Sequence, residues 1–236
     1  MTSRSTSIQY FLKNSAAVLF GNYDLAKRLQ IAADLDKATN HLFSGDPAIL
    51  PIPDDAPAEI PRIMLAAKDK KWRCNVSPDR LEFIYDEPDQ PREELNTIKE
   101  QYLTVLHSLA ECAKNELKAS VHRLGLIVTN FALPEEPVKL IERTFIREGV
   151  LFGPRQLEIH ILNMTTIGNL EVNKWCRIFS RDVSYGDKRK TALFVIFDLN
   201  TLSDSDKPNE FSADAITAFY DIALAQVSDG IRTLFP

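Results

Sequence analysis

The sequence predicts an α+β fold in which a curved antiparallel sheet carries helices on one of its faces. Two observations support this prediction. Short segments in which apolar and polar residues alternate follow one another across brief turns, as they do in β-hairpins. Longer segments with apolar residues three and four positions apart, a spacing typical of helices, lie before and after these groups of strands.

The order of the predicted elements is β-α-β-β-β-α, and this order occurs twice along the chain. We therefore expect duplicated units, residues 1–118 and residues 119–236, that form one continuous structural domain. The two halves share no repeat at the level of single residues. A single α+β domain without internal symmetry is therefore the alternative.

The first unit opens with a strand at 15–24 that stops at a Gly-Asn pair. Asp24 is expected to cap the following helix, in which Ile31 and Leu35 lie on one face. Residues 44–61 hold five of the 13 prolines in the chain. Proline fixes φ and has no amide donor, so this Pro-rich loop is expected to form no regular element.

Three hairpin strands and a long helix complete the first unit. Alternating patterns place the strands at 62–67, 71–76 and 80–85, with "KDKK" and "SPDR" as the turns between them. The helix is expected at 89–118. Pro91 would lie in its first turn, where a missing amide hydrogen is tolerated.

The second unit repeats this order after Lys118. The predicted elements are a strand from Val121 to Phe131, a helix from Pro134, strands at 155–163, 169–183 and 191–200, and a final helix capped by Ser212. Alternation along 169–183 places Trp175, Arg177 and Phe179 on the sheet face away from the helices.

The strand at 191–200 is apolar on both sides, which indicates that both sides are buried. We expect the Pro-rich loop or another chain to cover its open side. The sequence thus favours a non-enzymatic interaction protein that docks a protein partner, or a second copy in a homodimer, on this face. The expected contact residues are Trp175, Arg177, Phe179, Leu193, Val195 and Phe197.

Two basic hairpin tips support a second hypothesis, a nucleic-acid-associated accessory protein. The tips carry Lys68, Lys70 and Lys71, and then Lys188, Arg189 and Lys190. Lysine on hairpin tips commonly protects sheet edges, whereas beside exposed aromatic rings it can contact phosphates. The net charge of −5 argues against attraction of polyanions by the molecule as a whole.

The sequence shows no pattern of a known reaction, metal site or cofactor site. The four histidines form no metal-binding spacing, and phosphate-binding glycine loops and the serine-hydrolase elbow are missing. An enzyme of unknown type would need His122 and His160 to meet near carboxylates. Three widely spaced cysteines indicate reduced thiols, and with no apolar signal or spanning segment we expect a cytoplasmic protein.

Two stretches resemble a sporadically distributed family of uncharacterised bacterial proteins across residues 60–135. Pro78, Asp79, Leu81 and Phe83 match the hairpin turn and strand of that family, and Arg123, Gly125, Leu126 and Asn130 match its strand after the long helix. Ile127 replaces the second arginine of the latter pattern, and the usual proline-rich opening is missing. The resemblance implies a bacterial or phage origin and a duplicated α+β build, and it implies no activity.

Overall fold

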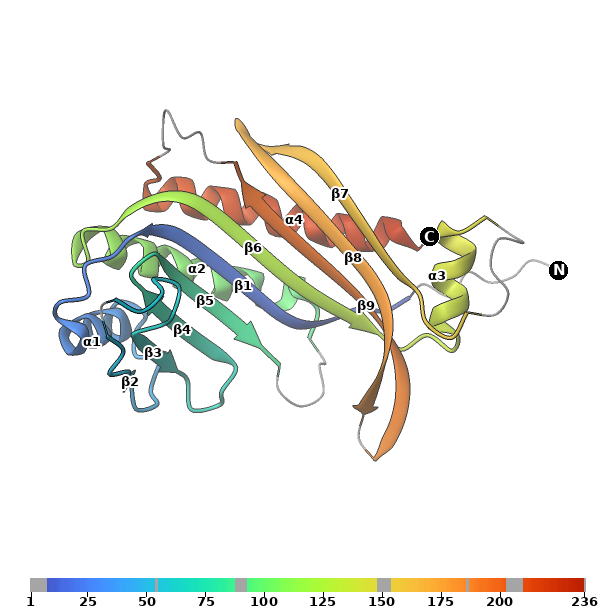
Figure 1. Cartoon of the computed structure of the whole chain (residues 1–236), viewed down its shortest axis with the longest axis horizontal. Coiled ribbons are helices and arrows are strands. Elements are labelled where there is room, and N and C mark those ends of the chain that lie inside the picture. The colour runs from blue at the N-terminus through green and yellow to red at the C-terminus, as the bar shows by residue number, and fades with distance from the viewer. Residues whose placement is uncertain are drawn as a thin grey trace.

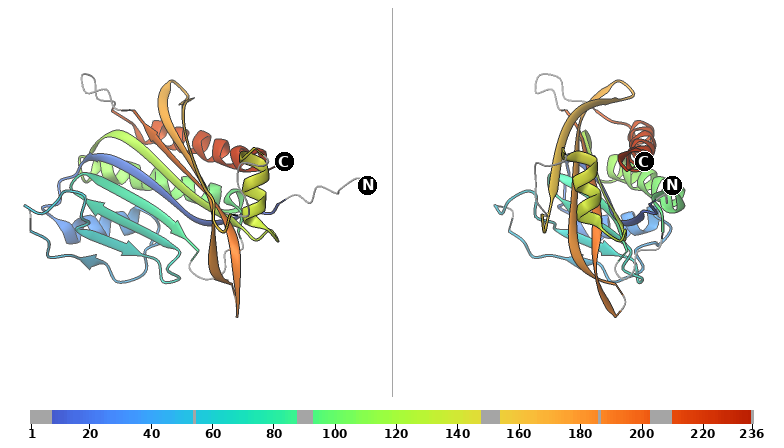
Figure 2. Two further views of the ribbon diagram at one scale, coloured as in Figure 1. Left: turned by 45° about the vertical axis from the view of Figure 1, so that its right-hand side comes forward. Right: turned by 90° about the vertical axis from the view of Figure 1, so that its right-hand side faces the viewer.

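A computed structural model describes residues 8–53, 55–87, 93–147, 154–185, 187–202 and 210–235. It has two layers: an antiparallel sheet of nine strands, and helices α2 and α4 across one face of this sheet (Figures 1 and 2). The predicted α+β class, with a curved antiparallel sheet and helices on one face, is confirmed.

The first half of the chain supplies five strands and two helices. They are β1 (Phe11–Asn22), α1 (Arg28–Ala38), β2 (Ala48–Ile49), β3 (Ile63–Ala66), β4 (Trp72–Ser77), β5 (Arg80–Asp86) and α2 (Leu95–Asn115). The short strand β2 lies inside the Pro-rich loop, where the sequence predicts none. It pairs with β3 over two residues only.

The second half supplies four strands and two helices. They are β6 (Ser120–Ala132), α3 (Pro137–Phe145), β7 (Glu158–Ile167), β8 (Leu170–Tyr185), β9 (Lys188–Thr201) and α4 (Ala213–Leu234). As predicted, Ser212 caps α4, because its hydroxyl accepts a hydrogen bond from the amide of Ala215 at 3.2 Å.

The starts of the other helices differ from the sequence prediction. Asp24 does not cap α1, which begins four residues later at Arg28; its carboxylate accepts from the amide of Ala26 at 3.0 Å in the preceding turn. Helix α2 begins at Leu95, and the predicted first-turn residue Pro91 lies outside the described residues. A short polar side chain marks a turn as readily as a helix start, which explains the shift at Asp24.

The strand order is β2-β3-β4-β5-β1-β6-β9-β8-β7. Strands β1 and β6 lie together at the centre, with β5, β4 and β3 following on one side and β9, β8 and β7 on the other. The order is therefore mirrored about the β1–β6 pair. That the halves are true duplicates, divided at residue 118, stays a prediction.

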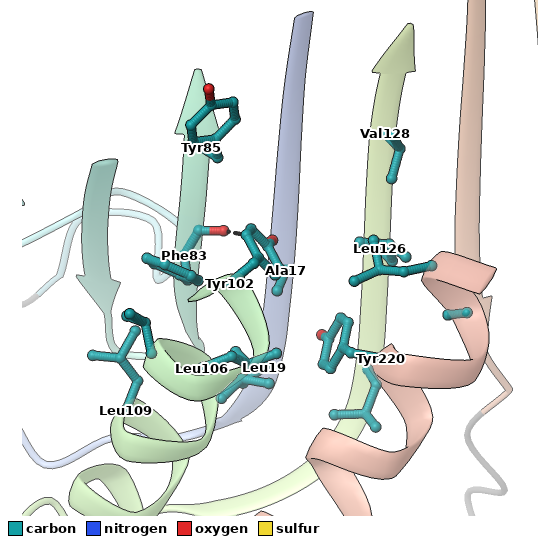
Figure 3. Close-up of a cluster of buried hydrophobic side chains, with 14 of the residues drawn as sticks. Ala17, Leu19, Phe83, Tyr85, Tyr102, Leu106, Leu109, Leu126, Val128 and Tyr220 are labelled. Atoms are coloured by element: carbon teal, nitrogen blue, oxygen red, sulfur yellow. Dashed lines mark hydrogen bonds between the residues drawn. The ribbon is translucent and has the colours of Figure 1, made fainter. Parts of the chain in front are cut away.

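Helices α2 and α4 bury the apolar side of the sheet. They run antiparallel to each other, since Lys99 pairs with Asp221 at 2.6 Å while His107, two turns later, contacts Thr217 at 3.1 Å. Figure 3 shows Tyr102 of α2 beside Phe83 and Ala17, and Tyr220 of α4 near Leu126, with both rings directed at the sheet. Within the described residues, no helix is long and apolar enough to cross a membrane.

Candidate functional site

The face of the sheet opposite α2 and α4, here called the open face, carries a line of paired residues across the second half. Leu162 of β7 pairs with Trp175 of β8, Trp175 with Asp198 of β9, and Asp198 with Ile127 of β6. Directly paired residues point to the same side of a sheet. These four side chains therefore form one row.

Apolar side chains in and beside this row are exposed. The exposed fraction is 48% for Leu162, 36% for Trp175 and 38% for Ile127, and it reaches 63% for Met164, two residues after Leu162 on the same side of β7. We call Ile127, Leu162, Met164 and Trp175 the apolar patch. Scattered exposed leucines are ordinary on a protein surface, but neighbouring exposed apolar side chains on one sheet face are typical of a binding surface.

The predicted placement of Trp175, Arg177 and Phe179 on the open face is confirmed by the strand register. Arg177 pairs with Ile196, and Phe179 pairs with Phe194, whose ring stacks on it at 5.2 Å between centroids. The role of these side chains in partner binding stays a proposal.

The prediction that Leu193, Val195 and Phe197 face a partner is wrong. Val195 and Phe197 pair with Ile178 and Cys176 on the helix side, and all three predicted residues are buried in the core. The ring of Phe197 lies so close to α4 that a Cβ on Gly230 would come within 3.1 Å of it.

The reason for this error is that β9 is apolar on both sides, so alternation alone does not say which side meets the helices. Pairing with β6 decides it, because Phe197 lies opposite Val128, which is buried under the helices. Phe194 and Ile196 consequently occupy the open face.

The Pro-rich loop does not cover this face of β9, as one interpretation of the sequence suggests. It leads into β2 and β3, at the far end of the sheet from β7 and β8. Phe194 is instead half-buried by rings on its own face, with Phe179 on one side and Phe131 at 6.0 Å on the other.

A polar cluster lies next to the apolar patch on the open face. The side-chain amide of Asn200 donates to the carboxylate of Asp198, and its oxygen accepts from the Arg123 guanidinium at 3.2 Å. Arg123 also lies over the ring of Phe20, 4.5 Å from its centre. Gly125 makes room for this arrangement, because a Cβ there would meet the Asn200 oxygen at 3.0 Å and the Phe20 ring at 3.3 Å.

Partial burial raises the pKa of Asp198 above its usual value. The hydrogen bond from Asn200 and the charges of Arg177 and Arg123 act in the opposite direction and favour the carboxylate. The patch thus surrounds a partly desolvated carboxylate whose neighbours fix its orientation. A partner that donates a hydrogen bond to this carboxylate therefore binds with higher affinity than a partner that leaves the carboxylate without a donor.

Other arginines near the open face have carboxylates beside them. Arg73 lies 3.4 Å from Asp86, and Arg80 lies 3.7 Å from Glu82. On β4 and β5 of the first half, the arginine charge on this face is therefore partly neutralised, which weakens the attraction of a polyanion there.

The two basic tips lie at the same end of the strands, the lower one in Figure 1, although the hairpins β3–β4 and β8–β9 lie toward opposite edges of the sheet. Part of their charge is neutralised: Lys71 pairs with Glu87 at 2.8 Å and with Glu93 at 3.6 Å, and Arg189 pairs with Asp182 at 3.1 Å. The remaining predicted contact residues, all exposed on these tips, are Lys68, Lys70, Lys188 and Lys190.

Lys190 also lines a surface hollow of about 720 Å³ beside the start of α3. The hollow has proline and leucine walls, and Glu135, Glu136 and Glu142 face it together with Lys139. Acidic side chains outnumber basic ones along this lining, which makes the hollow a poor anion site.

Histidines and thiols do not assemble into a reaction centre. His160 bonds Glu158 at 2.8 Å, whereas His122 lies on β6, with β9 and β8 between them. The structure therefore does not make the His122–His160 contact that the enzyme hypothesis requires. In the described ranges no three His, Cys, Asp or Glu side chains gather as a metal ligand set would. Burial raises the pKa of the Cys112 and Cys176 thiols to about 11.

Sequence reasoning missed the contact among Phe20, Arg123 and Asn200, because these residues come from three strands. One signal was available: Asp198 and Asn200 interrupt an otherwise apolar strand, and polar residues inside such a strand need partners.

Comparisons with known proteins do not place the chain in a family. No family model and no curated protein matches the chain. Among solved structures, a rolling circle replication initiator protein from Geobacillus stearothermophilus is similar with a TM-score of 0.31 and 10% sequence identity, over 95% of this chain and 85% of that chain. A likeness of this size carries no argument about function.

Proposed function

We propose that this protein is a non-enzymatic interaction protein that docks a protein partner on the open face of its second half. The observation that carries the proposal is the apolar patch of Ile127, Leu162, Met164 and Trp175, which lies on three strands around the partly buried Asp198. Apolar anchors around an oriented polar group are the usual composition of a protein interface core.

The site residues of this proposal differ in part from those expected from sequence. Trp175, Arg177 and Phe179 are kept, and Ile127, Leu162 and Met164 take the place of the three buried β9 residues. Trp175 is the expected anchor, since a large ring with low rotamer entropy commonly dominates binding.

The test is a quantitative comparison of captured proteins. Trp175→Lys combined with Ile127→Lys places charges in the patch at two exposed positions, each opposite the Asp198 carboxylate rather than a like charge, so the fold is expected to persist, as checked by circular dichroism. Proteins that bind the wild-type chain should be lost from the variant. The matched control is Leu29→Lys, on an apolar side chain of α1 that is 73% exposed and lies outside the open face. Equal capture by all three proteins contradicts the proposal.

A nucleic-acid-associated role is the second candidate, and it is favoured by the position of both basic tips at the same end of the strands. It predicts binding that weakens steeply as salt is raised. Replacing Lys68, Lys70, Lys188 and Lys190 by Gln should then abolish binding to labelled DNA or RNA at low salt. No binding by the wild-type chain at low salt rules this candidate out.

A further inference from the structure

Among the residues that the structure describes, strand β7 ends the sheet on the side of the second half and pairs with β8 alone (Figure 1). Its ten residues contain no proline, lysine or arginine, and its register with β8 is continuous. A regular strand at a sheet edge directs a row of main-chain donors and acceptors outward. Only another strand satisfies such a row along its whole length.

The opposite edge of the sheet is closed. There the edge strand β2 has two residues and is itself part of the Pro-rich loop. The buried Arg62 side chain holds this loop by donating to three of its carbonyl oxygens, those of Ile60 at 2.7 Å, Pro53 at 3.1 Å and Ala56 at 3.3 Å. Short strands and prolines are devices that prevent edge pairing, and β7 has neither of them.

We propose that β7 pairs antiparallel with β7 of a second copy of this chain, about a two-fold axis through Asn163. Paired residues share a side of the sheet, so this axis leaves the helices of both copies on one side. Leu162 then lies opposite Met164 of the second copy, and the reverse contact forms as well. The only carboxylate of β7, Glu158, lies outside the paired residues, so no like charges face each other.

Helix α4 adds an apolar contact on the helix-covered side of the proposed β7–β7 pairing. Its Gln226 donates to the carbonyl oxygen of Thr166 in β7 at 3.3 Å, which places α4 beside this strand. Ile222 lies one turn earlier on the same side of α4 and is 40% exposed. In the proposed register, Ile159 and Ile161 of the second copy lie opposite Ile167 and Thr165, next to Ile222.

A second copy is therefore the occupant that this edge fits, because the pairing opposes no like charges and places the exposed Leu162 and Met164 of each copy against one another. The two nine-stranded sheets would become continuous, and the two apolar patches would adjoin across the axis. The inference does not rest on the proposed function, since it is argued from the main-chain edge of β7, although Leu162 and Met164 of the apolar patch take part in both.

Two charged variants test the register. One carries Leu162→Lys with Met164→Lys, and the other carries Leu162→Glu with Met164→Glu. By sedimentation equilibrium, the wild-type chain should have about twice its monomer mass of 26.7 kDa. Each variant alone should have the monomer mass, because like charges face each other twice. An equimolar mixture should return to the dimer mass, because each Lys then faces a Glu; this recovery also shows that both variants are folded.

A wild-type monomer at 100 µM, or variants that remain dimeric alone, overturns the proposal. Crosslinking provides an independent check: Asn163→Cys should give a disulfide dimer, because Cβ atoms of directly paired residues lie about 4.5–5.5 Å apart. Thr166→Cys should give no disulfide dimer, because in this register residue 166 lies opposite residue 160 of the second copy. Equal crosslinking at both positions contradicts the register. Trp175→Lys with Ile127→Lys should keep the dimer mass, which separates failure of this inference from failure of the docking proposal.

Discussion

The hydroxyl of Tyr220 on α4 lies 2.9 Å from the carbonyl oxygen of Gly125 on β6, and 3.0 Å from that of Val18 on β1. Val18 and Gly125 are paired residues of the two central strands. One fully buried side chain thus connects the last helix to the junction of the two halves.

Replacing Tyr220 by Phe should lower the free energy of unfolding by about 1–3 kcal/mol, because buried carbonyl oxygens lose a donor. Urea unfolding followed by fluorescence measures the change. Tyr10→Phe is the matched control, since the Tyr10 hydroxyl is buried and has no hydrogen-bond partner among the described residues. A neutral or stabilising effect is expected there, and an equal loss in both variants contradicts this account of Tyr220.

High pH should unfold the protein through its tyrosines. Burial raises the pKa of the Tyr23, Tyr85, Tyr102 and Tyr220 hydroxyls above the usual value near 10. Their contribution to stability is present below about pH 10 and is lost as pH rises toward the folded-state pKa values, because the unfolded chain ionises first. Tyrosinate absorbance at 295 nm should therefore rise together with loss of the helical circular-dichroism signal. Complete tyrosine ionisation in a folded protein would contradict the burial of these hydroxyls.

Removing the Arg62 side chain should open the closed edge of the sheet. Arg62→Ala leaves three loop carbonyl oxygens without a donor and should cost about 2–4 kcal/mol in free energy of unfolding. Limited proteolysis should then cut within residues 44–61 faster than in the wild type. Arg189→Ala, at an exposed tip, is the control and should change neither quantity. An unchanged cleavage rate in Arg62→Ala would show that the loop is held by other contacts.

The Asp198 carboxyl should make stability depend on pH. Its pKa is raised in the folded state by burial, so its contribution favours folding at low pH and is lost as pH rises from about 4 through the folded-state pKa. Asp198→Asn should remove this decrease and leave the protein at least as stable at pH 7. Thermal unfolding across pH 4–7 provides the comparison, with exposed Asp182→Asn as the control. A large loss of stability at pH 7 would instead show that the hydrogen bond from Asn200 and the nearby charges of Arg177 and Arg123 dominate.

The open face was predictable where polar and apolar residues alternate. In β8, Trp175 and Arg177 share a side that is plainly distinct from the side of the buried Cys176 and Ile178, and the structure places them accordingly. In β9, both sides are apolar, so the same reasoning assigned Val195 to the wrong side. Alternation fixes which residues share a side, but only the partner strands determine which side is covered.

The sequence by itself determined the local elements: its periodicity specified the strands and helices, and Ser212 specified the start of α4, because these features depend on near neighbours in the chain. Tertiary structure alone decided which side of β9 lies under α4 and how Arg123, Asn200 and Phe20 come into contact. It also decided that β7 is one edge strand of the sheet and that Arg62 and the Pro-rich loop close the other edge. These features depend on strand order and register between residues far apart in sequence, and β9, apolar on both sides, carries no local signal for them.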